Sequence, residues 1–395
     1  MKKLISRNVW LLSMVSLFTD IASEMLYPVM PVYLKHIGFS ILLIGVLEGV
    51  AEATAGLSKG YFGTLSDNSG KRKPFVVFGY ALSSLSRPLM AFFTYPLWIF
   101  GVRTLDRLGK GIRTGARDAL LSDEATPETK GRVFGLHRSM DTLGAAIGPF
   151  CALVYFRYYP EEYEQLFLIA FAPGLIAIGL SYLIRERKKT DLIVKPKPKF
   201  LDFLRFWKTA PPTYKKLIVA LLVFALFNSS DVFLLLKVKE AGYSDMMVIG
   251  VYIFYNIVYA AAAYPMGMLA DKIGMKTVFI TGLTLFVLVY AGMGIASNGW
   301  VFICLFILYG IYSAATEGIA KAWISNLIDT SQTATAIGTY TAFQSICTLV
   351  ASSLAGFIWY TVGASTLFLL TAAVTFGVVL FVGTIRPTIL DTVYQ

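Results

Sequence analysis

Residues 63–72 read GTLSDNSGKR and residues 267–276 read GMLADKIGMK, so glycine, leucine, aspartate, glycine and a final basic residue recur at matching positions. The two stretches lie 204 residues apart (267 − 63 = 204), and the same offset aligns KHIGFS at 35–40 with KEAGYS at 239–244. A repeat of this length is hard to produce by chance. It predicts two copies of one structural unit in the chain.

The repeated unit is hydrophobic over most of its length. Of the 395 residues, 56% are hydrophobic, and the mean hydropathy is +0.65. A transmembrane helix needs about 20 apolar residues, and parallel duplication of a six-span unit occurs in secondary transporters. We therefore predict an all-α membrane protein with twelve transmembrane helices in two pseudo-symmetric halves, at 9–33, 41–64, 74–95, 97–118, 133–156, 166–184, 217–236, 246–268, 277–297, 300–325, 333–358 and 364–385.

The positive charge of the chain is a topology signal. The net charge is +11, and basic residues concentrate in the longest loop, 185–216. By the positive-inside rule this loop and both termini are cytoplasmic in the inner membrane, and nucleic-acid binding is not expected. The predicted domains are an N-terminal half (1–184), the basic linker (185–216) and a C-terminal half (217–395). Residues 201–207 of the linker could form an amphipathic surface helix or a solvated turn.

Three motifs resemble those of the major facilitator superfamily (MFS). The segment 63–72 resembles its motif A, and the resemblance implies a gating role for Gly63, Asp67, Gly70 and Arg72, and for Asp271 in the second copy. The motif departs from the family at Asn68, where arginine is usual. RLGKG at 107–111 resembles motif B, and Gly135, Gly144, Gly148 and Pro149 resemble motif C, which the family associates with exporters.

A stripe of charges runs along the predicted fourth span. At 100° per residue its members share one helix face, and a charge near the bilayer centre costs at least about 2.5 kcal/mol. Guanidinium groups match carboxylate or phosphate oxygens, so we predict that Arg103, Arg107 and Lys110 bind an anionic substrate. Arg113 and Arg117 lie near the predicted cytoplasmic end, where they could snorkel. The alternative is a salt-bridge network that involves Asp20, Glu24, Glu48, Glu52, Asp106 and Asp141.

Carboxylates in the first span are candidates for proton coupling. Asp20 and Glu24 are four residues apart and share a helix face, which continues to Tyr27. Desolvation raises the pKa of a buried carboxyl group, which suits it to bind and release a proton near neutral pH. The resemblance to motif B adds Arg107, which stands at the family's proton-transfer-linked arginine. The alternative is that arginines of the fourth span neutralise these carboxylates permanently.

The second half carries fewer charges, and we predict that it recognises substrate shape. Its candidate substrate-binding residues are Asn228, Asp231, Asn256 and Glu317, with Tyr27 contributed by the first half. Glu317 and Lys321 are four residues apart and could simply pair.

The predicted function is alternating-access transport of a small, anionic solute, coupled to protons. The alternative is proton-antiport export of drug-like or metabolic compounds, which the motif C resemblance favours. No enzyme is predicted, because the chain lacks an HExxH metal pair, a P-loop and a dinucleotide fingerprint. The three cysteines suggest neither a metal cluster nor a disulfide framework. We expect a monomer in the lipid bilayer without a cofactor, whose partners are its substrate and protons.

Overall fold

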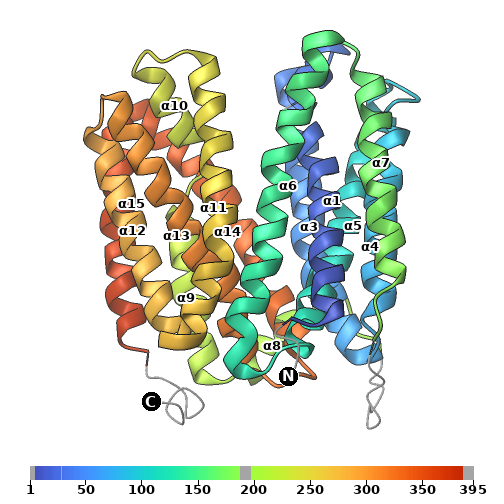
Figure 1. Ribbon diagram of the computed structural model, residues 1–395, viewed down its shortest axis with the longest axis vertical. Coiled ribbons are helices and arrows are strands. Elements are labelled where there is room, and N and C mark those ends of the chain that lie inside the picture. Colours follow the sequence, from blue (N-terminus) through green and yellow to red (C-terminus); the bar gives the residue numbers. More distant parts are fainter. Residues whose placement is uncertain (1–4, 28, 187–196, 386–395) are drawn as a thin grey trace. The chain divides into compact units, whose positions relative to one another are not determined.

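The computed structural model describes residues 5–27, 29–186 and 197–385 (Figure 1), and within these ranges all regular structure is helical. The first half contains α1 (Arg7–Leu26), α2 (Met30–His36), α3 (Ile41–Ser69), α4 (Lys73–Leu89), α5 (Pro96–Asp123), α6 (Lys130–Tyr158) and α7 (Tyr163–Tyr182). After α8 (Phe203–Thr209), the second half contains α9 (Pro212–Phe227), α10 (Val232–Glu240), α11 (Asp245–Ile273), α12 (Met275–Ile295), α13 (Gly299–Asn326), α14 (Thr333–Thr361) and α15 (Ala364–Gly383).

Contacts between helices divide the chain into two compact units. Unit 1 comprises residues 1–124, 140–209 and 329–342, and unit 2 comprises 125–139, 210–328 and 343–395. In unit 1, α5 packs against α3 and α4, while α7 packs against α1 and α4. In unit 2, α13 packs against α11 and α12, while α15 packs against α12 and α9. These pairings are equivalent under the 204-residue offset, so the sequence repeat is also a repeat of packing.

Most of the twelve predicted spans are single helices, but the first and the seventh are each broken into two. The first span is α1 followed by α2, and the seventh is α9 followed by α10. The predicted spans at 9–33 and 217–236 each correspond to such a pair of helices, and the interruption within them was not predicted. Apolar periodicity is similar on both sides of such a break, so hydropathy alone does not reveal it.

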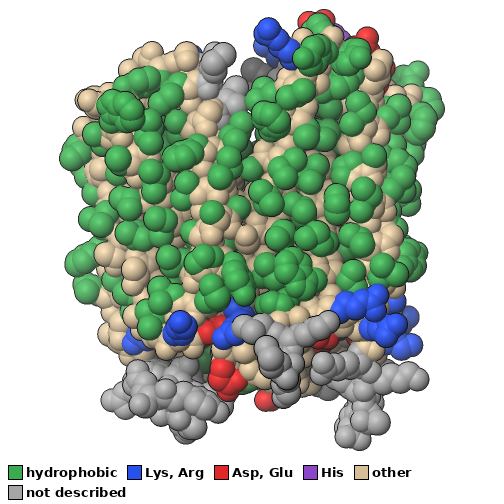
Figure 2. All heavy atoms as spheres, viewed as in Figure 1, with side chains coloured by type: hydrophobic (Ala, Val, Ile, Leu, Met, Phe, Trp, Pro, Cys, Tyr) green, Lys and Arg blue, Asp and Glu red, His purple; other side chains and the backbone are tan. Residues whose placement is uncertain are grey.

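Nine segments of the described chain are long and apolar enough to cross a membrane. The other three predicted spans correspond to α3, α4 and α5. Helix α4 has only 17 residues, α5 carries buried charges, and α3 carries the partly exposed Glu48 and Glu52. Hydrophobic side chains cover the middle of the visible face, and lysines and arginines gather near its lower edge (Figure 2). That distribution fits a multi-pass membrane protein.

The linker forms the short helix that one of the two alternatives predicts. In α8, Phe203 and Phe206 are buried. The ring of Phe203 lies over Gly60 of α3, where an added Cβ would come within 2.7 Å of it. The apolar face of α8 therefore packs on unit 1. The part of the predicted linker at 187–196 lies outside the described residues, and the domain division at 184 and 216 stays a prediction.

Two glycines of α11 allow a test of how closely this helix approaches the start of α6. A Cβ added at Gly267 would lie 2.2 Å from the carbonyl oxygen of Gly131, whereas a Cβ at Gly250 of the same helix would meet nothing within 4 Å. We expect Gly267→Ala to destabilise the protein by about 1–3 kcal/mol, the usual cost of overpacking. Gly250→Ala should be neutral or slightly stabilising, since alanine favours helix over glycine. Thermal unfolding in detergent checks both variants, and equal melting temperatures would contradict the close approach.

Candidate substrate and proton site

The charge stripe of α5 is largely neutralised by α3. Arg103 donates to both carboxylate oxygens of Glu48, at 2.9 and 3.1 Å. Arg107 lies 3.3 Å from Glu52 and 3.9 Å from Glu48. Asp106 lies 3.6 Å from Arg103. A buried charge is tolerated when it is paired in this way, and the ion pairs of the salt-bridge alternative are therefore present for these residues.

The stripe continues into the protein interior. Arg113 is 5% exposed, donates to the hydroxyl of Ser83 at 2.6 Å and lies 4.6 Å from the ring centroid of Tyr80. Arg117 is buried and lies 2.8 Å from Asp118. The expectation that Arg113 and Arg117 could snorkel was wrong, because α3 and α4 cover this end of α5 and provide partners.

Lys110 differs from the arginines of the stripe. Its side chain is exposed, and within the described parts of the chain it makes no hydrogen bond or ion pair. Glu24 of α1 is half-buried and is likewise without an ion pair or side-chain hydrogen bond among the described residues. Lys110 is an electrostatic neighbour of Glu24 and of Asp20. Tyr27, which is 52% exposed, is a neighbour of Glu24 and Arg107. Lys110, whose ammonium group has no partner among the described residues, thus lies near the acidic groups of α1.

A pair of carboxyl groups lies beside Lys110. Asp20 of α1 lies beside Asp141 of α6, and Asp141 accepts a hydrogen bond of 2.5 Å from Ser16. Two carboxyl groups placed side by side can share one proton. Asp141 was predicted only as a member of a salt-bridge network. The helical spacing of Ser16 and Asp20 on α1 could not reveal the partner on α6.

Glycines bring α6 onto α1. A Cβ at Gly144 would lie 2.6 Å from the carbonyl oxygen of Leu17, and one at Gly148 would lie 2.7 Å from the amide nitrogen of Met25. Small residues allow such close packing in membranes. The glycines of the motif C resemblance therefore have a local structural consequence, since they hold Asp141 against Asp20.

Two of the candidate residues of unit 2, Asn228 and Asp231, contact tyrosine hydroxyls. Asp231 accepts hydrogen bonds from the hydroxyls of Tyr255 and Tyr309, and the amide of Asn228 donates to the hydroxyl of Tyr312 at 3.3 Å. Asn256 is buried and donates to the backbone of its own helix. The ion pair that the structure gives for Glu317 is with Arg138 of α6.

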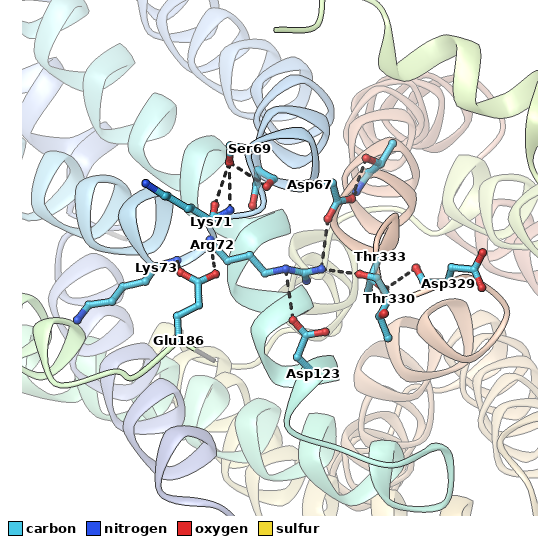
Figure 3. A network of polar contacts seen from close by, with 12 residues as sticks. Asp67, Ser69, Lys71, Arg72, Lys73, Asp123, Glu186, Asp329, Thr330 and Thr333 are labelled. Atoms are coloured by element: carbon cyan, nitrogen blue, oxygen red, sulfur yellow. Dashed lines mark hydrogen bonds and ion pairs between the residues drawn. The ribbon is translucent and has the colours of Figure 1, made fainter. Parts of the chain in front are cut away.

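The segment 63–72 lies at the centre of a polar network at the end of α3 (Figure 3). Asp67 lies 3.3 Å from Arg72 and accepts hydrogen bonds from the backbone and hydroxyl of Thr335, at 2.7 and 2.9 Å. Arg72 also contacts Asp123 and donates to the carbonyl oxygen of Thr330 at 2.6 Å. Gly70 ends α3 with φ of +66°, a left-handed conformation that glycine adopts readily. The network therefore ties α3 to the start of α14.

The second copy of the segment makes the equivalent contact in unit 2. Asp271 of α11 accepts hydrogen bonds from the backbone amides of Gly131 and Arg132, at 2.7 and 3.0 Å. Gly131 is 204 residues before Thr335 (335 − 131 = 204). Each carboxylate thus meets the N-terminal amides of a helix, where the helix dipole stabilises negative charge.

The Asp67 contact is expected to depend on pH. Asp67 lies beyond the predicted span 41–64, and burial raises the pKa of its carboxyl group from 3.8 to about 6. Because the folded state binds the proton more tightly than the unfolded chain, its contribution to stability is present at low pH and is lost between about pH 4 and 6. We expect the melting temperature of the wild-type protein to fall relative to that of Asp67→Asn over this range. Asp123→Asn is the matched control, and parallel pH profiles of wild type and Asp67→Asn would contradict the assignment.

Two repeated units with broken first helices and embedded charges define a multi-pass membrane protein of the secondary-transporter class. The chain belongs to the Major Facilitator Superfamily, whose family description matches residues 12–258 and 242–390. An uncharacterized MFS-type transporter of Methanocaldococcus jannaschii is 34% identical over 361 residues, which cover 90% of this chain and 89% of that protein. The resemblance found in the motifs is thereby confirmed.

Solved structures share the fold. The human organic anion transporter MFSD10 aligns with a TM-score of 0.79 at 15% identity and covers 95% of this chain and 99% of its own. The transporter FucP in its outward conformation aligns with a TM-score of 0.78 at 13% identity and covers 98% of this chain and 100% of its own. The all-helical fold with twelve transmembrane helices in two six-helix halves is therefore established, as is a role in membrane transport.

Proposed function

We propose that this protein is a proton-coupled symporter of a small anionic solute. The observation that carries the proposal is the Asp20–Asp141 carboxyl pair beside Lys110, a cation with no side-chain partner among the described residues. The human protein of similar fold is an organic anion transporter, and FucP is a fucose:proton symporter. At 15% and 12% identity these likenesses concern the fold, so the proposal rests on the residues.

Charge balance links the proton to the anion. With Asp20, Glu24 and Asp141 ionised, the charge of Lys110 is more than offset, and an anion would be repelled. Each proton that these carboxyl groups take up removes one negative charge and leaves Lys110 free to attract an anion. A ligand that binds the protonated state better shifts the population toward it, so proton and anion are carried in the same direction.

The arginines have different roles in this proposal. Arg103 is held by both oxygens of Glu48 and by Asp106, which suits a structural role. Arg107 contacts Glu52 and Glu48 at longer distances, and both glutamates are partly exposed. Arg107 can therefore exchange a glutamate for a substrate oxygen, with Tyr27 nearby. Lys110 provides the first point of attachment, and Arg107 provides the second.

The remaining predicted residues complete the proposal. Asn256 and Glu317 contribute to substrate selection in unit 2, while Gly63, Asp67, Gly70, Arg72 and Asp271 hold helix ends together in one state of the transport cycle and release them in the other. The basic linker and both termini face the cytoplasm, and the protein works as a monomer in the inner membrane.

Transport into proteoliposomes tests the function. An inward proton gradient should drive accumulation of one or more labelled anions from a panel of carboxylates and organophosphates, and a proton ionophore should abolish it. Lipophilic cations form the comparison set. Proton-driven efflux of lipophilic compounds with no anion uptake would favour the exporter alternative, which rests on the motif C resemblance of Gly135, Gly144, Gly148 and Pro149.

A further inference from the structure

The seventh span is interrupted at a place rich in oxygen atoms. The apolar segment Pro212–Glu240 is long enough to cross a membrane, yet α9 ends at Phe227 and α10 begins at Val232. The backbone of Asn228 is extended, with ψ of 91°, and its backbone N–H donates to the carbonyl oxygen of Phe224. Among the described residues, the carbonyl oxygens of Ala225 and Leu226 accept no hydrogen bond. The C-terminal end of α9 therefore presents open carbonyls and the negative pole of its dipole inside the span.

A carboxylate lies at the other side of this break. The two oxygens of Asp231 accept hydrogen bonds from Tyr309 and Tyr255, at 2.6 and 2.5 Å. Each oxygen of the carboxylate thus accepts one phenol hydrogen bond. No lysine, arginine or histidine of the described chain lies within ion-pair distance of Asp231. A carboxylate oxygen can accept more than one hydrogen bond or metal contact, so both oxygens of Asp231 keep acceptor capacity.

The side-chain oxygen of Asn228, at the same break, also accepts no hydrogen bond from the described residues. The side-chain amide nitrogen of Asn228 donates to the hydroxyl of Tyr312. The Oδ1 atom of Asn228 therefore points away from that hydroxyl. That oxygen is buried and has no hydrogen-bond partner among the residues that the structure describes. A buried polar atom without a partner costs about 1–3 kcal/mol, so a ligand that coordinates it would recover this free energy.

We propose that the break between α9 and α10 binds a small monovalent inorganic cation such as Na⁺, with Asp231, Asn228 Oδ1 and the open carbonyls of α9 as its oxygen ligands. A single carboxylate among neutral oxygens balances one positive charge. Divalent cations usually bind several carboxylates, and the described residues contain no cluster of three acidic, histidine or cysteine side chains. Half-helix C-termini and unwound carbonyls coordinate Na⁺ in other transporter folds.

The internal repeat gives this site an equivalent position in unit 1. Under the 204-residue offset, Asn228 is equivalent to Glu24 (228 − 24 = 204) and Asp231 to Tyr27 (231 − 27 = 204). The first span is broken at the same position, between α1 and α2. Each half thus has a broken helix with one carboxylate near the break. In unit 1 its neighbours include Lys110 and Arg107, whereas in unit 2 they are tyrosines, so only the second carboxylate needs a cation from solution.

Binding to the purified full-length protein tests this proposal independently of transport. Thermal unfolding is measured in NaCl, LiCl, KCl and choline chloride at constant ionic strength, and ²²Na⁺ binding gives the stoichiometry. We expect saturable stabilisation by Na⁺ over choline, with one ion per chain. Asp231→Asn and Asn228→Ala should each weaken Na⁺ binding by about tenfold or more, which corresponds to about 1.4 kcal/mol. Glu240→Gln, at the far end of α10, is the matched control and should bind Na⁺ as the wild type does.

The outcomes separate the possibilities. Identical melting curves in Na⁺ and choline, with no ²²Na⁺ bound, would overturn the proposal. So would stabilisation by organic ammonium compounds alone, because Asp231 would then recognise part of a substrate. Wild-type Na⁺ affinity in both Asp231→Asn and Asn228→Ala would also overturn it. If Asp231→Asn does not fold, the Na⁺ affinities of Asn228→Ala and Tyr309→Phe are compared with that of the wild type instead. Loss of proton-driven anion uptake would leave the Na⁺ result unchanged, so the two proposals fail separately.

Discussion

Asp141→Asn should abolish proton-driven accumulation of the substrate, with a loss of at least about tenfold, while substrate exchange across the membrane persists. The asparagine can still hydrogen-bond to Asp20 but cannot share a proton with it, so binding survives and coupling does not. Asp20→Asn should have the same effect. The measurement is uptake into proteoliposomes with an imposed pH gradient, compared with exchange of internal and external substrate without a gradient.

The double variant distinguishes a shared proton from two separate ones. If Asp20 and Asp141 hold one proton together, Asp20→Asn combined with Asp141→Asn should be no worse than either single change, because residues that act as a unit are not additive. Glu24→Gln tests the remaining carboxylate of α1, which lies near the pair. Wild-type gradient-driven uptake in Asp141→Asn and Asp20→Asn would place the coupling proton elsewhere.

Lys110→Gln should weaken binding of the anionic substrate by about tenfold or more, with little change in melting temperature. A charge-assisted hydrogen bond contributes about 1.5–3 kcal/mol, and each 1.4 kcal/mol is a factor of ten in affinity. Because Lys110 is exposed and has no side-chain partner among the described residues, its replacement leaves no buried charge behind. Substrate-dependent thermal shifts measure affinity and stability in one experiment.

Two arginine variants provide the contrast. Arg103→Gln should mainly lower the melting temperature, since it leaves Glu48 without its bidentate partner. Arg107→Lys keeps the charge but loses the planar fork, and we expect an affinity loss of about tenfold. A stable Lys110→Gln protein with unchanged affinity for every transported anion would refute the proposed substrate site.

Local patterns were enough to predict the architecture. Hydropathy together with the six-span repeat predicted twelve spans, and the repeat of 63–72 at 267–276 made Asp67 and Asp271 equivalent. Both carboxylates do meet helix N-termini, at Thr335 and Gly131. These features are predictable because each depends on residues that are close in sequence or related by one fixed offset.

The distribution of partners among the embedded charges could not be predicted in the same way. A helical stripe shows that Arg103, Arg107 and Lys110 share a face, but Arg103 and Arg107 are neutralised by α3, with Arg103 and Glu48 separated by 55 residues. Asp141 meets α1 at Ser16 across 125 residues. Periodicity describes one helix at a time, and long-range pairing depends on how closely two helices approach.

The amino-acid sequence by itself thus determined the membrane class, the number of spans, the duplication and the family, because hydrophobic length and a repeated motif are properties of the chain. Only the tertiary structure decided that Lys110 has no side-chain partner in the described part of the chain, that Asp20 faces Asp141, and that the first and seventh spans are broken. The physical reason is that a charge in a low-dielectric interior takes its properties from the partner groups that packing brings within a few ångströms.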